Sequence, residues 1–244
     1  MRATTSTTSV SARVIDEIRV LVVAGIAVGA VVVGGGGRLA MMVLRLSSSE
    51  RVHGVTSDDG FIIGRVTLGG TYNLLHIGAA VGLIGAGAYR LVAPWLIGPS
   101  WFRRSTTAAA AGAVVGSMLL HADGVDFTLL TPTWLAVGLF IGLPALFGMA
   151  IGVAVDRFAR PGSWIASGRR RWALPIVLTA CFPGTMLVIP VLATTVTACV
   201  AGQQSIRLMR VRSSTTYGFG VRLVWSSIAI AGLVAVVRDV QAIV

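Results

Sequence analysis

The sequence has no lysine, only two cysteines and only nine acidic residues among its 244. Two cysteines cannot build a disulfide framework, and thirty glycines with eight prolines do not make a collagen repeat. Charged residues form 12% of the chain, about half the share of an ordinary soluble domain. In their place 55% of the chain is apolar, with a mean hydropathy of +0.85, which excludes disorder. The composition therefore predicts an all-α, polytopic transmembrane helix bundle.

All twenty basic residues are arginines, and they give a net charge of +11 and a pI near 11.5. A charge of this size is also typical of nucleic-acid-binding domains. However, the arginines lie between apolar runs, and they form no stripe interleaved with aromatic residues. Positive charge on the cytoplasmic side and attraction to anionic headgroups explain this distribution. We therefore expect a bilayer with anionic headgroups as partner, and no nucleic acid.

Apolar runs divide the chain into spans, because a bilayer core about 30 Å thick requires about 20 apolar residues per helix. After a polar cytoplasmic lead at 1–19, we expect residues 20–244 to form a single transmembrane domain. The predicted spans are about 20–45, 70–92, 106–120, 132–155, 172–201 and 219–237. The apolar run continues well past its first segment, which favours a retained anchor over a cleaved signal peptide.

The arginine count orients this bundle. With the N-terminus inside, six spans place 12 arginines inside and 8 outside. If the stretch 172–201 instead folds back at Pro183-Gly184, the count becomes 15 against 5. Re-entrant segments are tolerated only where protein buries them, so we predict six spans. The expected location is a bacterial cytoplasmic membrane, crossed several times, with both termini inside.

Prolines also mark the fifth span. Pro175, Pro183 and Pro190 indicate a kinked or broken helix over 172–201, and nearby threonines can satisfy the backbone carbonyls that prolines release. Broken helices of this kind form substrate sites in some transporters, although a simple kink is the commoner outcome.

Glycines spaced four apart predict close packing of the first four spans, because small residues let helix backbones approach each other in lipid. The pairs are Gly25/Gly29, Gly78/Gly82, Gly112/Gly116, Gly138/Gly142 and Gly148/Gly152.

Two links that are predicted to face outward share a pattern. An aspartate follows a histidine by five residues in each, as His53 with Asp58 and His121 with Asp126. Imidazole and carboxylate groups suit a divalent metal, and the two links supply four such ligands if they meet. Two further carboxylates complete the polar residues of these links: Asp59 and Asp123. The Asp-Gly pairs are equally ordinary turn signals.

His76 is predicted inside the second span, with Asn73 and Tyr72 one helical step away. Ionisable residues within a span are rare and are functional candidates by default. We therefore add His76 and Asn73 to the candidate polar cluster. The alternative is a structural hydrogen bond from the histidine to a neighbouring helix.

Three short segments, Gly37–Met41, Ser57–Phe61 and Asp123–Phe127, resemble small polytopic membrane proteins of high-GC Gram-positive bacteria. The resemblance covers roughly residues 1–150. It implies a membrane protein with paired outward loops, and it carries over no catalytic residue.

The chain has no HExxH, CxxC, GxSxG or P-loop motif. We therefore expect a non-enzymatic transporter-like unit or a subunit of a membrane complex, with other membrane subunits as partners and no cofactor. In that case His76 and Arg38 should face the bundle interior or a partner helix. The alternative is a membrane-embedded, metal-dependent enzyme that uses the outward-facing His/Asp cluster.

Overall fold

The computed structural model describes residues 4–48, 66–121, 129–160, 172–204 and 215–243, and the single residues 54, 124, 127, 162, 163 and 165. All regular structure within these residues is helical, as predicted. The elements are α1 (Thr4–Val28), the π-helix η1 (Gly29–Gly35), α2 (Gly36–Ser47), α3 (Leu68–Val92), the 3₁₀ turn η3 (Ala93–Trp95), α4 (Ser100–Leu119), α6 (Thr133–Phe158), α7 (Ala173–Cys181), the 3₁₀ turn η4 (Pro183–Leu187), α8 (Ile189–Gln204) and α10 (Thr215–Ile243).

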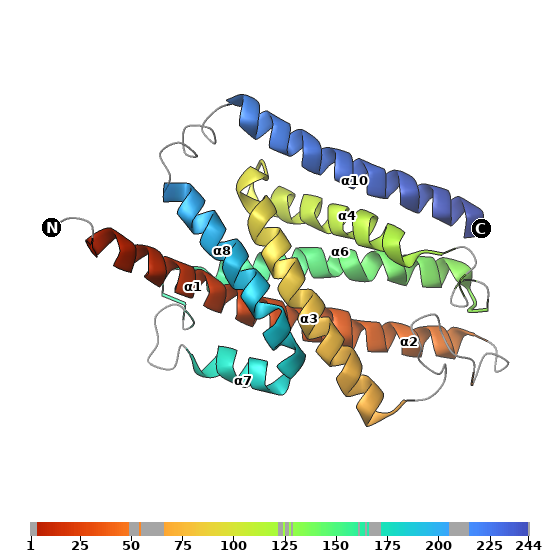
Figure 1. Ribbon diagram of the computed structural model, residues 1–244. Helices are drawn as coiled ribbons and strands as arrows, with labels where there is room; N and C mark the ends of the chain where they lie inside the picture. The colour runs from red at the N-terminus through yellow and green to blue at the C-terminus, as the bar shows by residue number, and fades with distance from the viewer. Residues whose placement is uncertain are drawn as a thin grey trace.

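The elements α1, η1 and α2 follow one another as one long helix (Figure 1). Its middle is the uncharged run Val20–Gly37, which has no residue that would end a helix in lipid. Side chains of Val20–Ala30 lie in a core cluster with α3 and α8. Leu44, near the other end, belongs to a second cluster with α6 and α10. The long helix therefore extends through both halves of the bundle.

The long helix crosses α3 at glycines on both sides. A Cβ atom added to Gly82 would lie 2.6 Å from the Cα of Gly29, and one added to Gly25 would lie 2.9 Å from the carbonyl oxygen of Gly82. Atoms of real side chains do not come this close, so the crossing requires hydrogen at these positions. The first two predicted glycine pairs thus meet each other, as their spacing indicated.

The helices α4 and α6 form a second close pair. A Cβ on Gly112 would lie 3.1 Å from that of Ala145, and one on Gly148 would lie 2.8 Å from that of Ala111. Gly138 and Gly142 have open space where a Cβ would be, so close packing at this predicted pair is wrong. The spacing alone does not say which face of α6 meets a neighbour.

Four helices of the described chain are long and apolar enough to cross a membrane: Ser11–Ser47, Leu68–Trp95, Thr133–Phe158 and Thr216–Ile243. They match the predicted spans 20–45, 70–92, 132–155 and 219–237. The predicted span 106–120 lies in α4, which packs against α6 and α10 and is not among the four. The count of about six spans is therefore not confirmed.

The structure divides the predicted span 172–201 into α7, η4 and α8, so the helix is broken there rather than simply kinked. Phe182 leaves the helical conformation, with φ −129° and ψ 70°, and Pro183 has no N–H with which to continue the helix. We call α7–η4–α8 the hairpin and Phe182–Leu187 its tip. Apolar content and length, on which the prediction depended, do not distinguish one span from two short helices.

The hairpin enters and leaves at the same end of the bundle. Trp172, the residue just before α7, has its ring against the guanidinium of Arg19 in α1, and the tip lies beside His76 of α3. The helix α8 then returns along α3 until Thr195 lies near Leu91. Figure 1 shows both arms, with α7 running toward the lower half of α3 and α8 running back from it.

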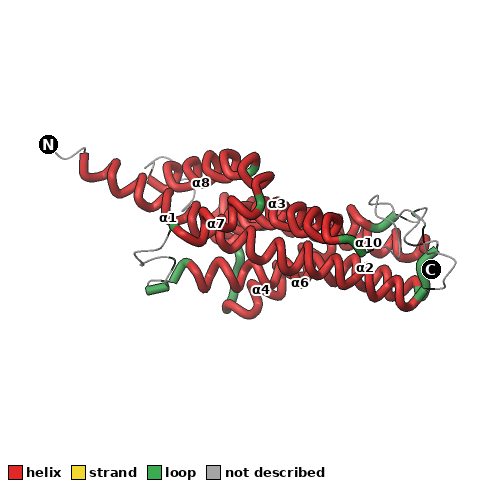
Figure 2. The backbone as a smooth tube through the Cα atoms, turned by 90° about the horizontal axis from the view of Figure 1, so that it is seen from below, coloured by secondary structure: helices red, strands yellow, loops and turns green. Residues whose placement is uncertain are grey.

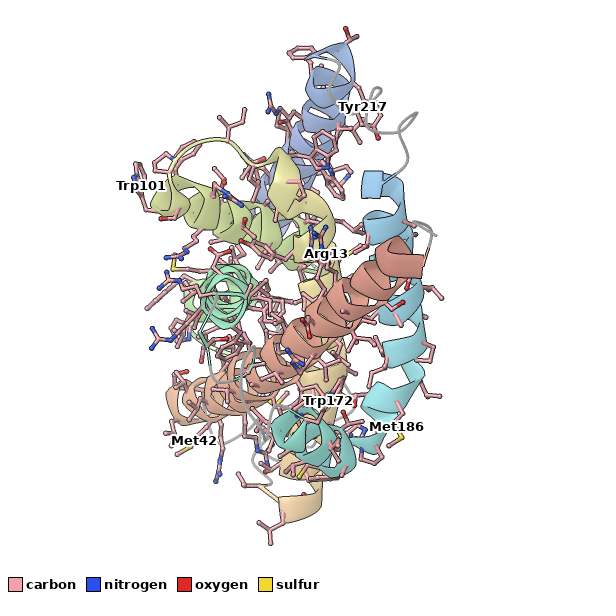
Figure 3. The ribbon with its side chains drawn as sticks, turned by 90° about the vertical axis from the view of Figure 1, so that its left-hand side faces the viewer. Arg13, Met42, Trp101, Trp172, Met186 and Tyr217 are labelled. Atoms are coloured by element: carbon pink, nitrogen blue, oxygen red, sulfur yellow. The ribbon has the colours of Figure 1, made fainter. Side chains whose placement is uncertain are left out.

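The two ends of the bundle differ. The Trp95 end, named after the last residue of η3, holds the starts of α1, α4, α7 and α10; Figure 3 views the molecule from this side and labels Trp101, Trp172 and Tyr217 on the last three. The Ser48 end holds the end of α2 and the start of α6. The described part of the chain begins and ends at opposite ends of the bundle (Figure 2), so the prediction that both termini lie inside is not confirmed.

Candidate functional site

His76 meets the broken part of the hairpin. The backbone N–H of Gly184 donates to Nε2 of His76 at 2.9 Å. This bond requires a lone pair on Nε2, which the ring offers when its proton is on Nδ1. The sequence predicted a polar residue of functional interest at this position, and it allowed a bond to a neighbouring helix. The structure supplies that bond, to a segment 108 residues further along the chain.

Tyr72, one turn before His76, holds the other side of the same break. Its hydroxyl donates to the carbonyl oxygen of Cys181 at 2.7 Å. Its ring stacks on Phe182 with centroids 6.3 Å apart, and His76 meets Phe182 edge-on at 6.0 Å. Two backbone groups that the break releases, the Cys181 carbonyl and the Gly184 N–H, are therefore satisfied by side chains of α3. Such groups would otherwise cost several kcal/mol each in a membrane.

Threonine hydroxyls of the hairpin bond carbonyl oxygens three or four residues earlier in their own turns, and the bonds seen here do not include the predicted ones to the carbonyls that Pro183 and Pro190 release. Thr185 is completely buried, and its Oγ1 donates to the carbonyl of Phe182 at 2.6 Å. Thr194 and Thr195 both donate to Val191, and Thr197 donates to Ala193. The backbone of the hairpin is thus bonded by its own threonine hydroxyls as well as by side chains of α3.

The predicted outward cluster is placed only in part. His121 follows α4 at the Ser48 end, with Nδ1 3.3 Å from the carbonyl of Leu119. Asn73 is exposed on α3 and takes no part in the contacts around His76. The other members lie outside the described residues: His53, Asp58, Asp59, Asp123 and Asp126. Within the residues described, no group of three metal-binding side chains occurs, so the metal site stays a prediction.

One contact does join the bases of the two predicted links. Ser48 Oγ donates to the carbonyl of Thr131 at 3.1 Å and accepts its N–H at 3.0 Å. Ser48 ends α2, where the first link begins, and Thr131 precedes α6, where the second link ends. The two links therefore share an attachment point at the Ser48 end.

Ion pairs cross between helices at the Trp95 end, where the sequence predicted no pairs. Arg90 of α3 binds Glu17 of α1 through two hydrogen bonds, of 2.6 and 3.1 Å. Arg104 of α4 binds Asp156 of α6 at 3.3 Å, and the hydroxyl of Tyr89 donates to the same carboxylate. A pattern in the sequence could have indicated these ion pairs. Each of the two acids lies at the end of an apolar run, and arginines lie at the ends of the neighbouring predicted spans.

A third carboxylate at this end, Asp16, pairs with Arg19 one turn later at 3.0 Å. The Arg19 side chain is 1% exposed, and its guanidinium lies over the Trp172 ring with its carbon 5.5 Å from the centroid. Cation–π contact and ion pairing together compensate its burial. These contacts fix the residue just before the hairpin to the long helix.

Arg38 lies one turn beyond η1, in the half of the long helix that leads to the Ser48 end. Its Nε and Nη2 atoms are shielded from solvent and have no hydrogen-bond partner among the described residues. This agrees with the expectation that Arg38 faces the interior.

Taken together, the polar contacts concentrate where the hairpin breaks and where helices are tied at the Trp95 end. Comparison with known protein families, with curated proteins and with solved structures finds no match to this chain.

Proposed function

We propose that this chain is a multi-pass, non-enzymatic, transporter-like unit of a bacterial cytoplasmic membrane, and that the hairpin lines its solute pathway. The observation that carries the proposal is the tip, where the α-helix is interrupted by a 3₁₀ turn that Tyr72 and His76 hold against α3. Non-helical backbone at membrane depth is tolerated where protein buries it or where it lines a water-filled cavity. Discontinuous helices are also where many transporters bind their substrates.

The distribution of arginines supports an orientation with the N-terminus and the Trp95 end inside. Eight arginines on described residues belong to this end: Arg13, Arg19, Arg90, Arg103, Arg104, Arg157, Arg160 and Arg222. The links 161–171 and 205–214, which join helix ends here, contain six more. Cytoplasmic ends carry such an excess, and anionic headgroups attract it. Six spans give 12 arginines inside and 8 outside, whereas a chain that folds back at the tip gives 15 inside and 5 outside, a stronger excess on the inner side.

The outer faces of the bundle support a lipid environment and other membrane subunits as partners. On α10, Leu223, Ile230 and Leu233 are each more than half exposed. This helix contacts α4 along one side and η3 near its start. Apolar side chains of this kind are met by acyl chains or by another membrane helix.

The proposal is tested by the access of water to the tip. Both native cysteines lie in the hairpin, and Cys181 is exposed beside the tip. In a Cys199→Ser chain reconstituted into vesicles, a membrane-impermeant, charged methanethiosulfonate should modify Cys181, since it reacts in water. The matched control places a cysteine on the lipid side of α10, as Ile230→Cys in a chain without native cysteines.

We expect the thiol at position 181 to react at least tenfold faster than the thiol at position 230. Equal, slow reaction at both positions would show that the tip meets lipid or protein alone, and would overturn the pathway.

A further inference from the structure

The hydrogen bond at the tip depends on the protonation state of one side chain. Gly184 N–H donates to a lone pair of Nε2 in His76. A proton bound at Nε2 occupies that lone pair, so the imidazolium would present a second N–H to the N–H of Gly184. Two donors then face each other at 2.9 Å, and the bond cannot form. Histidine is also the side chain that ordinarily changes charge between about pH 5 and 8.

The surroundings of His76 offer little to stabilise the added charge in place. Tyr72, on the same helix, meets His76 edge-on with ring centroids 5.8 Å apart, and it is bonded to the backbone carbonyl of Cys181 at the end of α7. The helix α2, which also contacts α3, carries the cation Arg38. No carboxylate forms an ion pair with His76 in the described ranges. An imidazolium at this position is therefore better accommodated after the tip has moved and water has entered.

The rest of the hairpin is anchored independently of the tip. Trp172 is held by Arg19 at the start of α7. On α8, Leu192, Val196 and Val200 are buried in the core cluster with α1 and α3. Loss of the bond to His76 would thus free the tip and leave both arms of the hairpin in place.

We propose that proton binding at Nε2 of His76 releases the tip of the hairpin from α3, so that the proton is a ligand of this site. No covalent bond other than the new N–H is formed, and the Gly184 hydrogen bond is the one that breaks. The inference rests on the proposed function, because it makes the proton the species that opens or closes the pathway. The stretch from Phe182 to Leu187 is the moving part.

A distance measurement tests this directly. One spin label is placed within the tip on Met186→Cys, whose native side chain is 55% exposed, and the other on Ile97→Cys just past the far end of α3, in a chain without native cysteines. The two sites lie roughly 30 Å apart, judged from the length of α3. Double electron–electron resonance in vesicles between pH 5 and pH 8 should show one distance at high pH and a displaced, broader distribution at low pH.

Two variants separate the proton from other causes. His76→Gln keeps an acceptor that does not titrate, so the tip should stay at the high-pH distance throughout. His76→Leu has no acceptor, so the tip should stay displaced at every pH. Circular dichroism and size exclusion confirm that each variant is folded.

The proposal is overturned if the wild-type distance does not change with pH. It is overturned equally if His76→Gln shows the same pH-dependent shift, because another group would then be titrating. This distance measurement needs no solute and no water-filled pathway. If the tip moves with pH but Cys181 does not react with the impermeant reagent, the proposed pathway is refuted and the proton-dependent release of the tip stands.

Discussion

Replacing Gly82 with alanine should weaken the crossing between the long helix and α3. The added Cβ would lie 2.6 Å from the Cα and 2.9 Å from the nitrogen of Gly29, and closer still to the carbonyl oxygen of Gly25. Carbon atoms pack favourably at about 3.5–4.0 Å, so the backbones must separate by roughly 1 Å. The obstructing atoms belong to the backbone of the long helix, and no side chain can rotate away to make room.

Overpacking of this kind costs about 1–3 kcal/mol, which lowers the ratio of folded to unfolded protein by about 5- to 150-fold. The matched control is Gly142→Ala on α6, where no atom lies within 4 Å of the new Cβ. Alanine favours a helix over glycine by up to about 1 kcal/mol, so the control should be neutral or slightly stabilised.

Unfolding of the purified protein in mixed micelles with increasing SDS, followed by circular dichroism, measures both variants. The reasoning is refuted if Gly82→Ala unfolds at the same SDS fraction as the wild type, or if Gly142→Ala loses as much stability as Gly82→Ala.

Three further outcomes are expected. In a chain without native cysteines, Ala159→Cys and Thr216→Cys should be labelled by an impermeant maleimide from the same side of the membrane, whereas labelling from opposite sides would restore six spans. A double-mutant cycle on Glu17 and Arg90 should give a coupling energy of roughly 1 kcal/mol that decreases with salt; zero coupling would leave the pair without a stabilising role. The predicted metal site entails near-stoichiometric divalent metal in the purified protein and its loss in His121→Ala, and a metal-free wild type would remove that site.

Much of the helical framework is predictable from the sequence, for a physical reason. Membrane-crossing helices need long apolar runs, and residues 70–92 and 132–155 have little other way to satisfy their backbone in lipid. The glycine pairs Gly25/Gly29 and Gly78/Gly82 likewise identify a close crossing. Spacing does not tell which glycines face a partner, because Gly142 has the same pattern and meets nothing.

The hairpin and its contacts were harder to predict because they depend on distant parts of the chain. Pro183 and Gly184 indicated a break, yet a kinked span and a folded-back hairpin have the same local sequence. The arginine count favours folding back, but re-entrant segments are tolerated only where protein buries them. The sequence does not show that burial, so it favours six spans. His76 was singled out by its rarity within a span, but its partner is 108 residues away. The sequence therefore singles out His76, but it does not reveal the hydrogen bond with Gly184 that connects His76 to the hairpin.

The seven residues of η1 have a consequence for the evolution of this chain. A π-helical segment accommodates one extra residue within an α-helix, and each residue turns a helix by about 100°. The wider turn absorbs the extra residue, so the parts of the long helix before and after η1 keep the relative phase of an uninterrupted α-helix. Deleting one residue from Gly29–Gly35 would therefore leave a regular α-helix with Leu44 still directed at its cluster with α6 and α10, whereas a further insertion without a second wide turn would rotate Leu44 away from it by about 100°. The π-helix thus lets the chain change length by one residue while the contacts in both halves of the bundle stay in register.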